Sequence, residues 1–331
     1  MGKFRKVERP RQASFKKTSP YFSDSARADG LSHGKPRPFC LPLECTEENL
    51  FSEIRSSVTA YFGREEIKWH GGRQRRPSNH MCDSQVCCVN FLLPFADKPE
   101  ALVELLRPVF PDMRRILPME DSEQYVSHEW IGLENYLGER LPRHGKRTRG
   151  ALFTSADAAV MFERADGLRQ IALIEWKYTE AYYKSFIRFA RKSGTDRLAI
   201  YAHLLNRDDC PLYKESLPSL DALFYDPFDQ LMRQQLLAHE MEKAQELGAQ
   251  VVSVLHIAPT HNVDLPRVTS PALQHLGNTM IEVWTRLVRR PDRFASKSTE
   301  ALFGRFPVER FPELACWWEY VTARYSWLSD D

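Results

Sequence analysis

Residues 155–180 read SADAAVMFERADGLRQIALIEWKYTE, and this stretch limits which fold the rest of the chain can adopt. After a leading Asp157, residues 158–162 are apolar. Residues 170–178 are rich in Ile, Leu, Trp and Tyr, as a buried strand would be. Asp166-Gly167 stands between the two runs and is a strong turn signal. The stretch therefore predicts a two-stranded hairpin.

Three charged side chains fall at one end of that hairpin. Side chains alternate along a strand, so Glu175 and Lys177 point to the same face, about 7 Å apart, and Trp176 points to the other. Charges in an apolar strand are costly to bury unless they meet each other, a metal ion or water. Asp157 lies on the paired strand, and its carboxylate can reach the same place. The pattern thus predicts two carboxylates and one ammonium at the rim of a sheet.

Such a group suits metal-assisted hydrolysis of a phosphodiester. Mg²⁺ is a hard cation that binds one or two carboxylates and keeps several waters. It polarises a phosphoryl oxygen and lowers the pKa of its bound water. Lys177 can orient that water or stabilise charge developing on the phosphate.

Asp157, followed on the next strand by Glu175-Trp176-Lys177, resembles the PD-(D/E)xK motif of the restriction-endonuclease-like nuclease superfamily. The resemblance implies a core of a helix, three strands, a helix and a strand. It also implies that Asp157 and Glu175 bind the divalent metal and that Lys177 assists the attacking water. The chain departs from the motif at Ala156, which stands where the motif has Pro.

A second resemblance lies upstream. Residues 80–95, HMCDSQVCCVNFLLPF, resemble a segment of uncharacterised bacterial proteins labelled as restriction endonucleases of the same superfamily, and the likeness covers most of residues 65–290. A zinc site is the alternative for this Cys- and His-containing region, but no Cys-x-x-Cys pair is present. Gln85 and Asn90 also fit a simpler role, as buried polar groups that fix a loop.

The order of the remaining elements agrees with this core. We expect a helix over 97–110, a strand over 124–131, the hairpin, a helix over 226–248 and a strand over 251–258. The first strand would place Glu129 near Asp157 as an auxiliary acid, although an exposed carboxylate fits equally well. On the second helix, Gln230 and Gln234 share a face that can meet a nucleic-acid backbone. The fold class is therefore α/β, a restriction-endonuclease-like core with a mixed sheet and added N- and C-terminal helices.

The rest of the chain divides by composition. Residues 1–40 form a basic arm that we expect to be disordered, since residues 1–38 carry ten basic against three acidic residues. Residues 41–96 form a helical and loop region whose helix starts at Thr46. Residues 97–260 form the nuclease-like core, and residues 261–331 form a helical region.

The segment that follows the hairpin mixes aromatic and basic side chains. The residues concerned are Tyr182, Tyr183, Lys184, Phe186, Arg188, Phe189, Arg191 and Lys192. This mixture is suited to stacking on bases and contacting phosphates. A partly buried helix with a basic outer face has the same pattern, and it is the interpretation we favour.

Whole-chain composition restricts the class of protein. The 331 residues, 43% of them hydrophobic, can bury a substantial core, and the net charge of +2 neither supports nor excludes a nucleic-acid partner. Seven cysteines without a regular framework, no secretory signal and no membrane-length apolar run are typical of a reduced, cytoplasmic protein.

These observations predict an Mg²⁺-dependent endonuclease that cleaves DNA, with Mn²⁺ able to substitute and with catalytic Asp157, Glu175 and Lys177. Glu129 and Gln230 are secondary candidates. Enzymes that cut both strands are often dimers, so a homodimer is one alternative for the assembly. The alternative function is an inactive nuclease-fold module that binds nucleic acid or protein. A third interpretation is an ordinary hairpin with a rim salt bridge.

Overall fold

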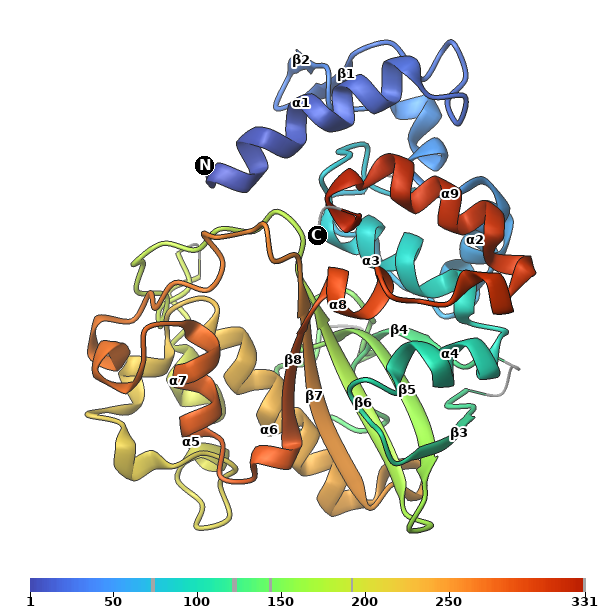
Figure 1. Cartoon of the computed structure of the whole chain (residues 1–331). Coiled ribbons are helices and arrows are strands. Elements are labelled where there is room, and N and C mark those ends of the chain that lie inside the picture. The colour runs from blue at the N-terminus through green and yellow to red at the C-terminus, as the bar shows by residue number, and fades with distance from the viewer. Residues whose placement is uncertain (73–74, 121–123, 143–144, 192, 330–331) are drawn as a thin grey trace.

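The computed structural model describes residues 1–331 except 73–74, 121–123, 143–144, 192 and 330–331 (Figure 1). Within the described residues the main sheet has six strands, in the order β3–β5–β6–β7–β8, with β4 also paired to β5. These strands are β3 (Met113–Leu117), β4 (Ser127–Trp130), β5 (Ala156–Arg164), β6 (Arg169–Trp176), β7 (Val251–Ala258) and β8 (Phe294–Ser298).

Strands β5 and β6 form the predicted hairpin. They pair antiparallel from Ala158 opposite Ile174 to Glu163 opposite Arg169. In the turn, the Asp166 Oδ1 atom accepts a hydrogen bond of 3.1 Å from the Leu168 amide. Gly167 has a φ of +84°, which side-chain-bearing residues rarely adopt. The Asp-Gly signal therefore placed the turn correctly.

Two hydrophobic cores lie on opposite faces of this sheet, and the strands divide their side chains between them. Along β6, Ala172, Ile174 and Trp176 enter one core, and Ile171 and Leu173 enter the other. This alternation follows from the period of two along a strand. Since both faces are covered, β6 is apolar almost throughout, as its sequence predicted.

Different helices cover the two faces (Figure 1). On one side lie α2 (Arg55–Arg64), α3 (Ser84–Leu92), α4 (Pro99–Leu106), α8 (Thr299–Phe303) and α9 (Ala315–Arg324). On the other lie α5 (Arg197–Leu205), α6 (Phe228–Ala244) and α7 (Met280–Leu287). Helix α6 connects β6 to β7, which run parallel from Gln170 opposite Val251 to Trp176 opposite Ile257.

The predicted fold class is confirmed: helix α4, strands β4, β5 and β6, helix α6 and strand β7 occur in the expected order within a mixed sheet. Strand β3 is additional. The expectation that residues 261–331 form a helical region is wrong for β8, which pairs parallel with β7. Its sequence, FASKS, is short and polar, and pairing with the sheet edge rather than local propensity determines its conformation.

The expected disordered arm is also wrong. Residues Lys3–Thr18 form helix α1, and β1 (Gly30–Ser32) pairs with β2 (Lys35–Arg37) as a small hairpin (Figure 1). The buried stripe of α1 consists of Phe4, Glu8, Gln12 and Lys16. Because three of the four are polar, the helix shows no apolar periodicity, and its stability depends on specific hydrogen-bond partners.

The helix expected to start at Thr46 begins later. Residues Leu43–Asn49 and Ser52–Ile54 are short 3₁₀ turns, and α2 starts at Arg55. No capping hydrogen bond from Thr46 is formed, because its side chain is buried and its hydroxyl has no partner among the described residues. Helix α2 buries an apolar stripe formed by Val58, Tyr61 and Phe62.

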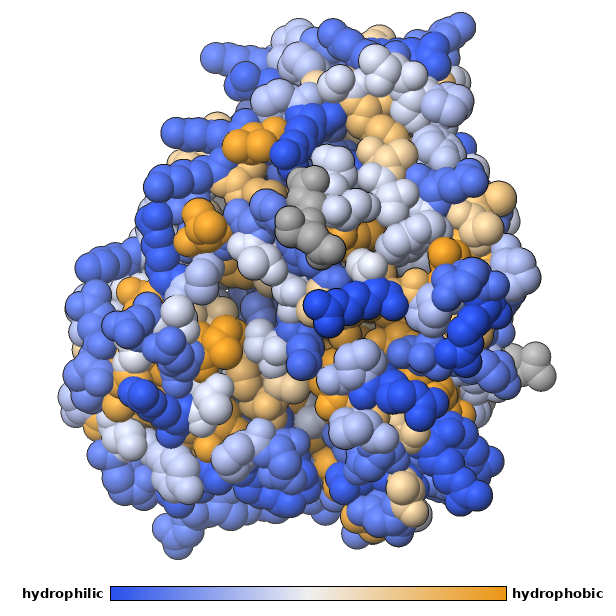
Figure 2. Space-filling model, in the orientation of Figure 1, coloured by the Kyte–Doolittle hydropathy of each residue, from blue (hydrophilic) through white to orange (hydrophobic). Residues whose placement is uncertain are grey.

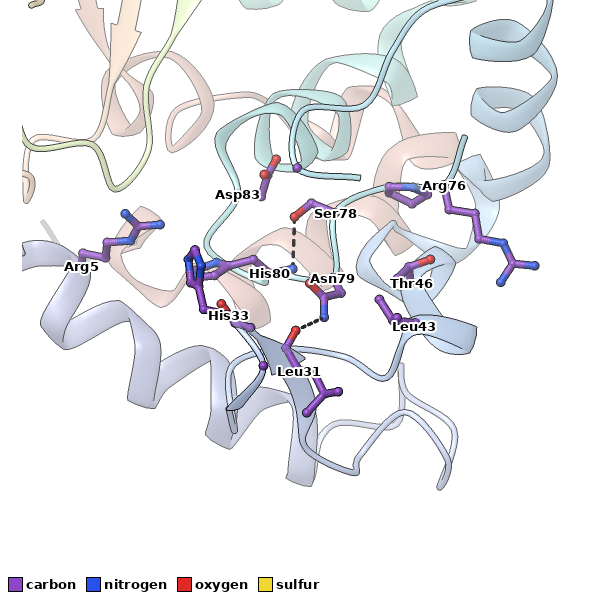
Figure 3. Close-up of a pocket in the computed structure, with 14 residues that line it drawn as sticks. Arg5, Leu31, His33, Leu43, Thr46, Arg76, Ser78, Asn79, His80 and Asp83 are labelled. Atoms are coloured by element: carbon purple, nitrogen blue, oxygen red, sulfur yellow. Dashed lines mark hydrogen bonds between the residues drawn. The ribbon is translucent and has the colours of Figure 1, made fainter. Parts of the chain in front are cut away.

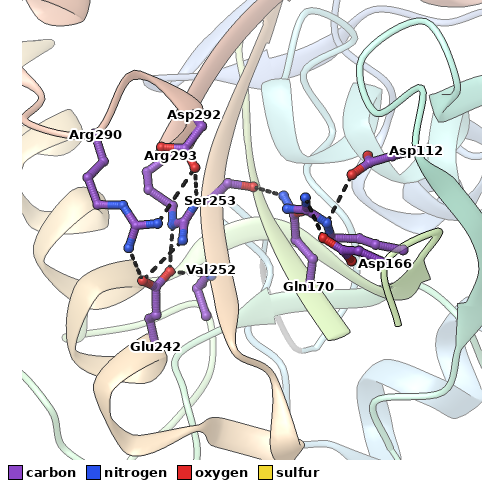
Figure 4. Close-up of polar contacts among 10 residues, drawn as sticks. Asp112, Asp166, Gln170, Glu242, Val252, Ser253, Arg290, Asp292 and Arg293 are labelled. Atoms are coloured by element: carbon purple, nitrogen blue, oxygen red, sulfur yellow. Dashed lines mark hydrogen bonds and ion pairs between the residues drawn. The ribbon is translucent and has the colours of Figure 1, made fainter. Parts of the chain in front are cut away.

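Polar contacts join the sheet to α6 at the end remote from residues 175–177 (Figure 4). Glu242 of α6 accepts a hydrogen bond from the Val252 amide at 2.8 Å and pairs with Arg293 at 2.6 Å. Gln170 donates to Ser253 across β6 and β7 at 2.9 Å.

The surface in Figure 2 is mostly hydrophilic, and its hydrophobic residues form separate areas. Among the described residues, no helix has the length and apolar character needed to cross a bilayer.

Candidate active site

Asp157, Glu175 and Lys177 lie on a common open cavity of about 460 Å³. Asp157 is at the start of β5, Glu175 is next to last in β6, and Lys177 directly follows β6. The amide of Lys177 donates to the Ile257 carbonyl at 2.8 Å, so the sheet still holds the backbone there. Trp176 points to the opposite face and packs in the core. The structure therefore brings together the three residues that the sequence singled out.

The three side chains are held by direct contacts. The Lys177 Nζ atom forms an ion pair with Glu175 Oε1. The Trp176 amide donates to Asp157 Oδ2 at 2.7 Å, which fixes that carboxylate against β6. The other oxygen, Asp157 Oδ1, accepts no hydrogen bond from the described residues. Glu175 and Lys177 are 4% and 8% exposed, so both charges are largely removed from bulk water.

Asp157 and Glu175 repel each other when both are ionised. Burial, together with the negative charge of Glu175, raises the pKa of Asp157 well above its ordinary value, although Lys177 acts in the opposite direction. For Lys177, burial alone would lower the pKa, but the attraction of Glu175 outweighs it, and the pKa lies well above the usual range. Lys177 pairs with Glu175, so it compensates the charge of Asp157 only in part.

Glu129 lies beside Asp157, as expected from the strand. In the pairing of β4 with β5, His128 is opposite Ala158 and Trp130 is opposite Ala156, so Glu129 is abreast of Asp157. The alternative of an exposed carboxylate is wrong, because Glu129 is fully buried.

The carboxylate of Glu129 is already well satisfied. It accepts hydrogen bonds from Gln85 and Ser155, both at 2.7 Å, and lies 3.6 Å from the His70 ring nitrogen. Burial raises the pKa of Glu129 to about 7. The hydrogen bonds from Ser155 and Gln85 act to lower this pKa, and the negative charge of Glu175 acts to raise it. Its backbone φ of +51° is unusual for a residue with a side chain, and such strain is common at functional sites.

Helix α6 forms one wall of the cavity. Gln234 donates to Glu175 Oε2 and, at 3.2 Å, to the Ser155 carbonyl, so it joins the two strand ends. Gln230, one turn earlier, also lines the cavity, and its Oε1 atom accepts a hydrogen bond from the Tyr182 hydroxyl at 3.2 Å. The predicted shared face is thus present, but Gln234 is buried against Glu175 and not free to meet a ligand.

Several residues of the site were not predicted from the sequence. His70, Ser155 and Tyr182 line the cavity or contact its acids. His256 of β7 is abreast of Glu175, is buried, and has a pKa lowered by burial to about 4. A histidine within a largely apolar strand was the available signal, since its register with β6 cannot be read from the sequence alone.

The aromatic loop, residues 181–191, begins at this cavity. The favoured interpretation as a helix is wrong, because no helix occurs in the described part of 181–196; Lys192 lies outside the described residues. The loop is held instead by the Arg188 side chain, which pairs with Asp196 at 2.6 Å and Asp221 at 2.8 Å. Its exposed aromatic side chains are Tyr183, Phe186 and Phe189, at 59%, 47% and 54%.

Gln85 and Asn90 are buried polar groups that fix neighbouring loops, as the simpler interpretation of this region predicted. Asn90 accepts a hydrogen bond from the Phe51 amide and donates to the Asn49 carbonyl, which fixes the loop before α2. Gln85 accepts from the His70 amide at 2.6 Å. Within the part of the chain that the structure describes, there is no group of three or more His, Cys, Asp or Glu residues that could hold a metal ion.

Comparison with known proteins identifies one family that the chain matches. Residues 7–326 match the family described as restriction endonuclease associating with ARP. No curated protein and no solved structure matches the chain. The match spans nearly the whole chain and includes the hairpin, α6 and the C-terminal helices. The chain therefore belongs to the family of restriction endonucleases associating with ARP.

Proposed function

We propose that the protein is a metal-dependent endonuclease that hydrolyses DNA phosphodiester bonds. The observation that carries this proposal is the convergence of Asp157, Glu175 and Lys177 on one cavity at the end of the β5–β6 hairpin. Membership of a family described as restriction endonucleases supports the same class of reaction.

The carboxylates fit a hard divalent cation. Asp157 and Glu175 present oxygen atoms to the same cavity, Asp157 Oδ1 is unpartnered among the described residues, and Lys177 offsets only part of the repulsion between the two acids. Since the described residues supply two carboxylates rather than a larger ligand cluster, the remaining ligands would be water, as is usual for Mg²⁺. Asp157 and Glu175 would hold Mg²⁺, or Mn²⁺ in its place.

The bound ion would supply Lewis acidity and a water of lowered pKa. The chain's own residues orient the reacting groups. Lys177 donates toward the cavity from beside Glu175, where it can hold a water molecule or the scissile phosphate. Gln234 fixes the other oxygen of Glu175, and the Trp176 amide fixes Asp157. Glu129, through Ser155 and Gln85, secures the wall of the cavity beside Asp157.

The aromatic loop supports a nucleic-acid substrate. Its exposed rings start within a few residues of Tyr182, which lines the cavity. Within the loop, Lys184 and Arg191 are exposed cations, whereas Arg188 is already paired with Asp196 and Asp221. Aromatic faces beside positive charge are suited to a polynucleotide, because bases stack on the rings and phosphates meet the cations.

A plasmid-cleavage assay tests the proposal. With Mg²⁺ or Mn²⁺ the protein should nick or linearise supercoiled DNA, and EDTA should abolish this. Lys177→Ala should reduce the rate by about a hundredfold or more, as for loss of a transition-state donor. Arg191→Ala, in the aromatic loop away from the acids, serves as a control for general loss of positive charge and should retain cleavage chemistry on saturating DNA. Linear product from a single binding event would favour the homodimer.

The inactive binding module is the alternative that this experiment separates. It predicts DNA binding that is unchanged by Glu175→Ala and no cleavage of supercoiled, linear or single-stranded DNA. It also predicts no increase in melting temperature on adding Mg²⁺ or Mn²⁺. That combination of results would overturn the nuclease proposal.

A further inference from the structure

A second cavity, of about 600 Å³, lies between the N-terminal segment on one side and Gly71 and residues 76–83 on the other (Figure 3). Its walls come from α1, the β1–β2 hairpin, the turn at residues 43–46 and the segment before α3. It is separate from the catalytic cavity, since the two share none of their lining residues. A cavity of this size accommodates a small molecule and is too small for a DNA duplex.

The lining carries more positive than negative charge. Arg5 and Arg76 supply two guanidinium groups against the single carboxylate of Asp83, and His33 and His80 add ring nitrogens that can form hydrogen bonds. That carboxylate is partly committed, because Asp83 caps α3 by accepting from the Val86 amide at 3.0 Å. Its pKa is raised by burial to about 6, so the cavity is most electropositive when this acid is protonated.

Several polar groups at this cavity have no partner within the protein. The buried atoms Arg5 Nε, Thr46 Oγ1 and His80 Nε2 form no hydrogen bond with the described residues. Thr46 is 3% exposed, so its hydroxyl has lost bulk water without gaining a protein acceptor or donor. Unsatisfied buried groups are costly, and an ordered water molecule or a bound ligand can supply the missing partners.

The cavity also has an apolar part. Leu31 and Leu43 line it and are 54% and 41% exposed, which is high for large aliphatic side chains on a concave surface. In Figure 3, Arg5 and His33 lie toward one side, and Leu43 and Thr46 lie toward the other. The lining therefore offers cations for an anionic group and aliphatic surface for a flat apolar one.

We propose that this cavity binds a nucleotide, with the phosphates at Arg5 and His80 and the base against Leu31 and Leu43. The binding is independent of the nuclease proposal, since none of these residues lines the catalytic cavity. Arg5 is the decisive residue: its guanidinium forms no hydrogen bond or ion pair with the described residues, so removing it should cost binding and not folding.

Isothermal titration calorimetry with ADP, in EDTA to prevent metal-mediated binding elsewhere, tests this site. Wild-type protein should bind ADP, and adenosine or inorganic phosphate alone should bind more weakly, because each fills one part of the cavity. Arg5→Gln should weaken ADP binding by about tenfold or more, as for loss of a charge-assisted hydrogen bond. Arg76→Gln should also weaken ADP binding, and because Arg76 is exposed, this substitution should leave folding intact.

Two control variants locate the binding. Lys6→Gln changes the neighbouring exposed cation of α1, and Glu175→Ala alters the catalytic cavity; both should bind ADP as the wild type does. The proposal is overturned if wild-type protein shows no binding at millimolar ADP. It is equally overturned if Arg5→Gln and Arg76→Gln bind normally, if Glu175→Ala alone loses binding, or if phosphate binds as tightly as ADP.

Discussion

Gln234 is the residue through which α6 holds Glu175 in place. Its amide donates to Glu175 and to the Ser155 carbonyl, so it links the acid of β6 to the entrance of β5. Groups that orient a metal ligand typically contribute 10- to 100-fold to metal affinity or activity. If the proposed nuclease activity holds, Gln234→Leu, which keeps the volume and removes the donor, should lower Mg²⁺-dependent cleavage by roughly tenfold or more.

Measuring cleavage rate against Mg²⁺ concentration checks this expectation, since a misplaced Glu175 should raise the metal concentration needed for half-maximal activity. Gln235→Leu is the matched control: it is the next residue of the same helix, is buried, and lines a different cavity. Equal metal dependence in the Gln234 and Gln235 variants would show that the contact with Glu175 does not matter.

His80 makes stability depend on pH. Burial, followed by the charges of Arg5 and Arg9, lowers its pKa from 6.5 to about 3. The unfolded chain therefore takes up a proton before the folded chain as the pH falls. The contribution of neutral His80 to the free energy of unfolding is complete above about pH 6.5. As the pH falls from there toward about 3, the free energy of unfolding decreases by up to about 1.4 kcal/mol per pH unit.

Urea unfolding of His80→Asn at several pH values between 4 and 7 measures that contribution. The Nδ1 atom of His80 accepts from the Cys82 amide at 3.0 Å, and an Asn carbonyl can replace that acceptor without titrating. The free energy of unfolding should fall less steeply with acidification in the variant than in the wild type. Parallel curves would mean that His80 is protonated equally in both states.

At the level of single residues, the sequence predicted the acids better than their partners. Asp157, Glu175 and Lys177 could be found because strand periodicity and a short turn relate them locally. Gln234 and His256 reach the same place through α6 and β7, which return to β6 only after a long connection. Tertiary register of that kind is not encoded in any local pattern, so neither the hydrogen bond of Gln234 to Glu175 nor the position of His256 abreast of Glu175 could be predicted.

Helix α1 shows how a polar element can be integral to a fold. Glu8 accepts hydrogen bonds from the Tyr178 hydroxyl at 2.5 Å and the Trp327 ring at 3.2 Å. Lys16 donates to the carbonyls of Ala28 and Cys40. The basic composition of this segment suggested disorder because composition counts charges but does not reveal their partners.

Arg324 of α9 joins three separate elements. Its guanidinium donates to the backbone and side chain of Asn49 at 2.6 Å, to Gln12 of α1 at 3.1 Å, and to the Met81 carbonyl at 3.1 Å. We expect Arg324→Leu to lower the free energy of unfolding by roughly 3 kcal/mol or more, because several buried acceptors would be left unsatisfied.

Chemical denaturation of this variant beside Arg310→Ala provides the comparison. Arg310 pairs with Glu104 at 3.1 Å, but its side chain is 59% exposed, and exposed ion pairs contribute less than about 1 kcal/mol. Similar losses in the two variants would mean that the contacts of Arg324 do not unite α1, α9 and the turn at Asn49.

The arrangement of the whole molecule follows from one sheet covered on both faces. Composition divides the chain at residues 40, 96 and 260, and residues 41–96 are expected to pack on the nuclease-like core. In the structure, α3, α4 and α9 all pack on the face that contains Ala172 and Ile174. Segments far apart in the sequence thus complete one core, which is a relation that composition along the chain cannot reveal.

Because β5, β6 and β7 contribute to both cores, we expect the chain to unfold in one cooperative transition. Leu105 belongs to one core and Leu236 to the other, and both are almost fully buried. Truncating either to Ala should cost about 2–5 kcal/mol. If the cores are coupled, Leu105→Ala and Leu236→Ala should each lower a single melting temperature, and differential scanning calorimetry should give equal calorimetric and van't Hoff enthalpies. A second transition that only one of the variants shifts would show that the two faces of the sheet unfold separately. The strands that position Asp157 and Glu175 would then be stabilised mainly by one face.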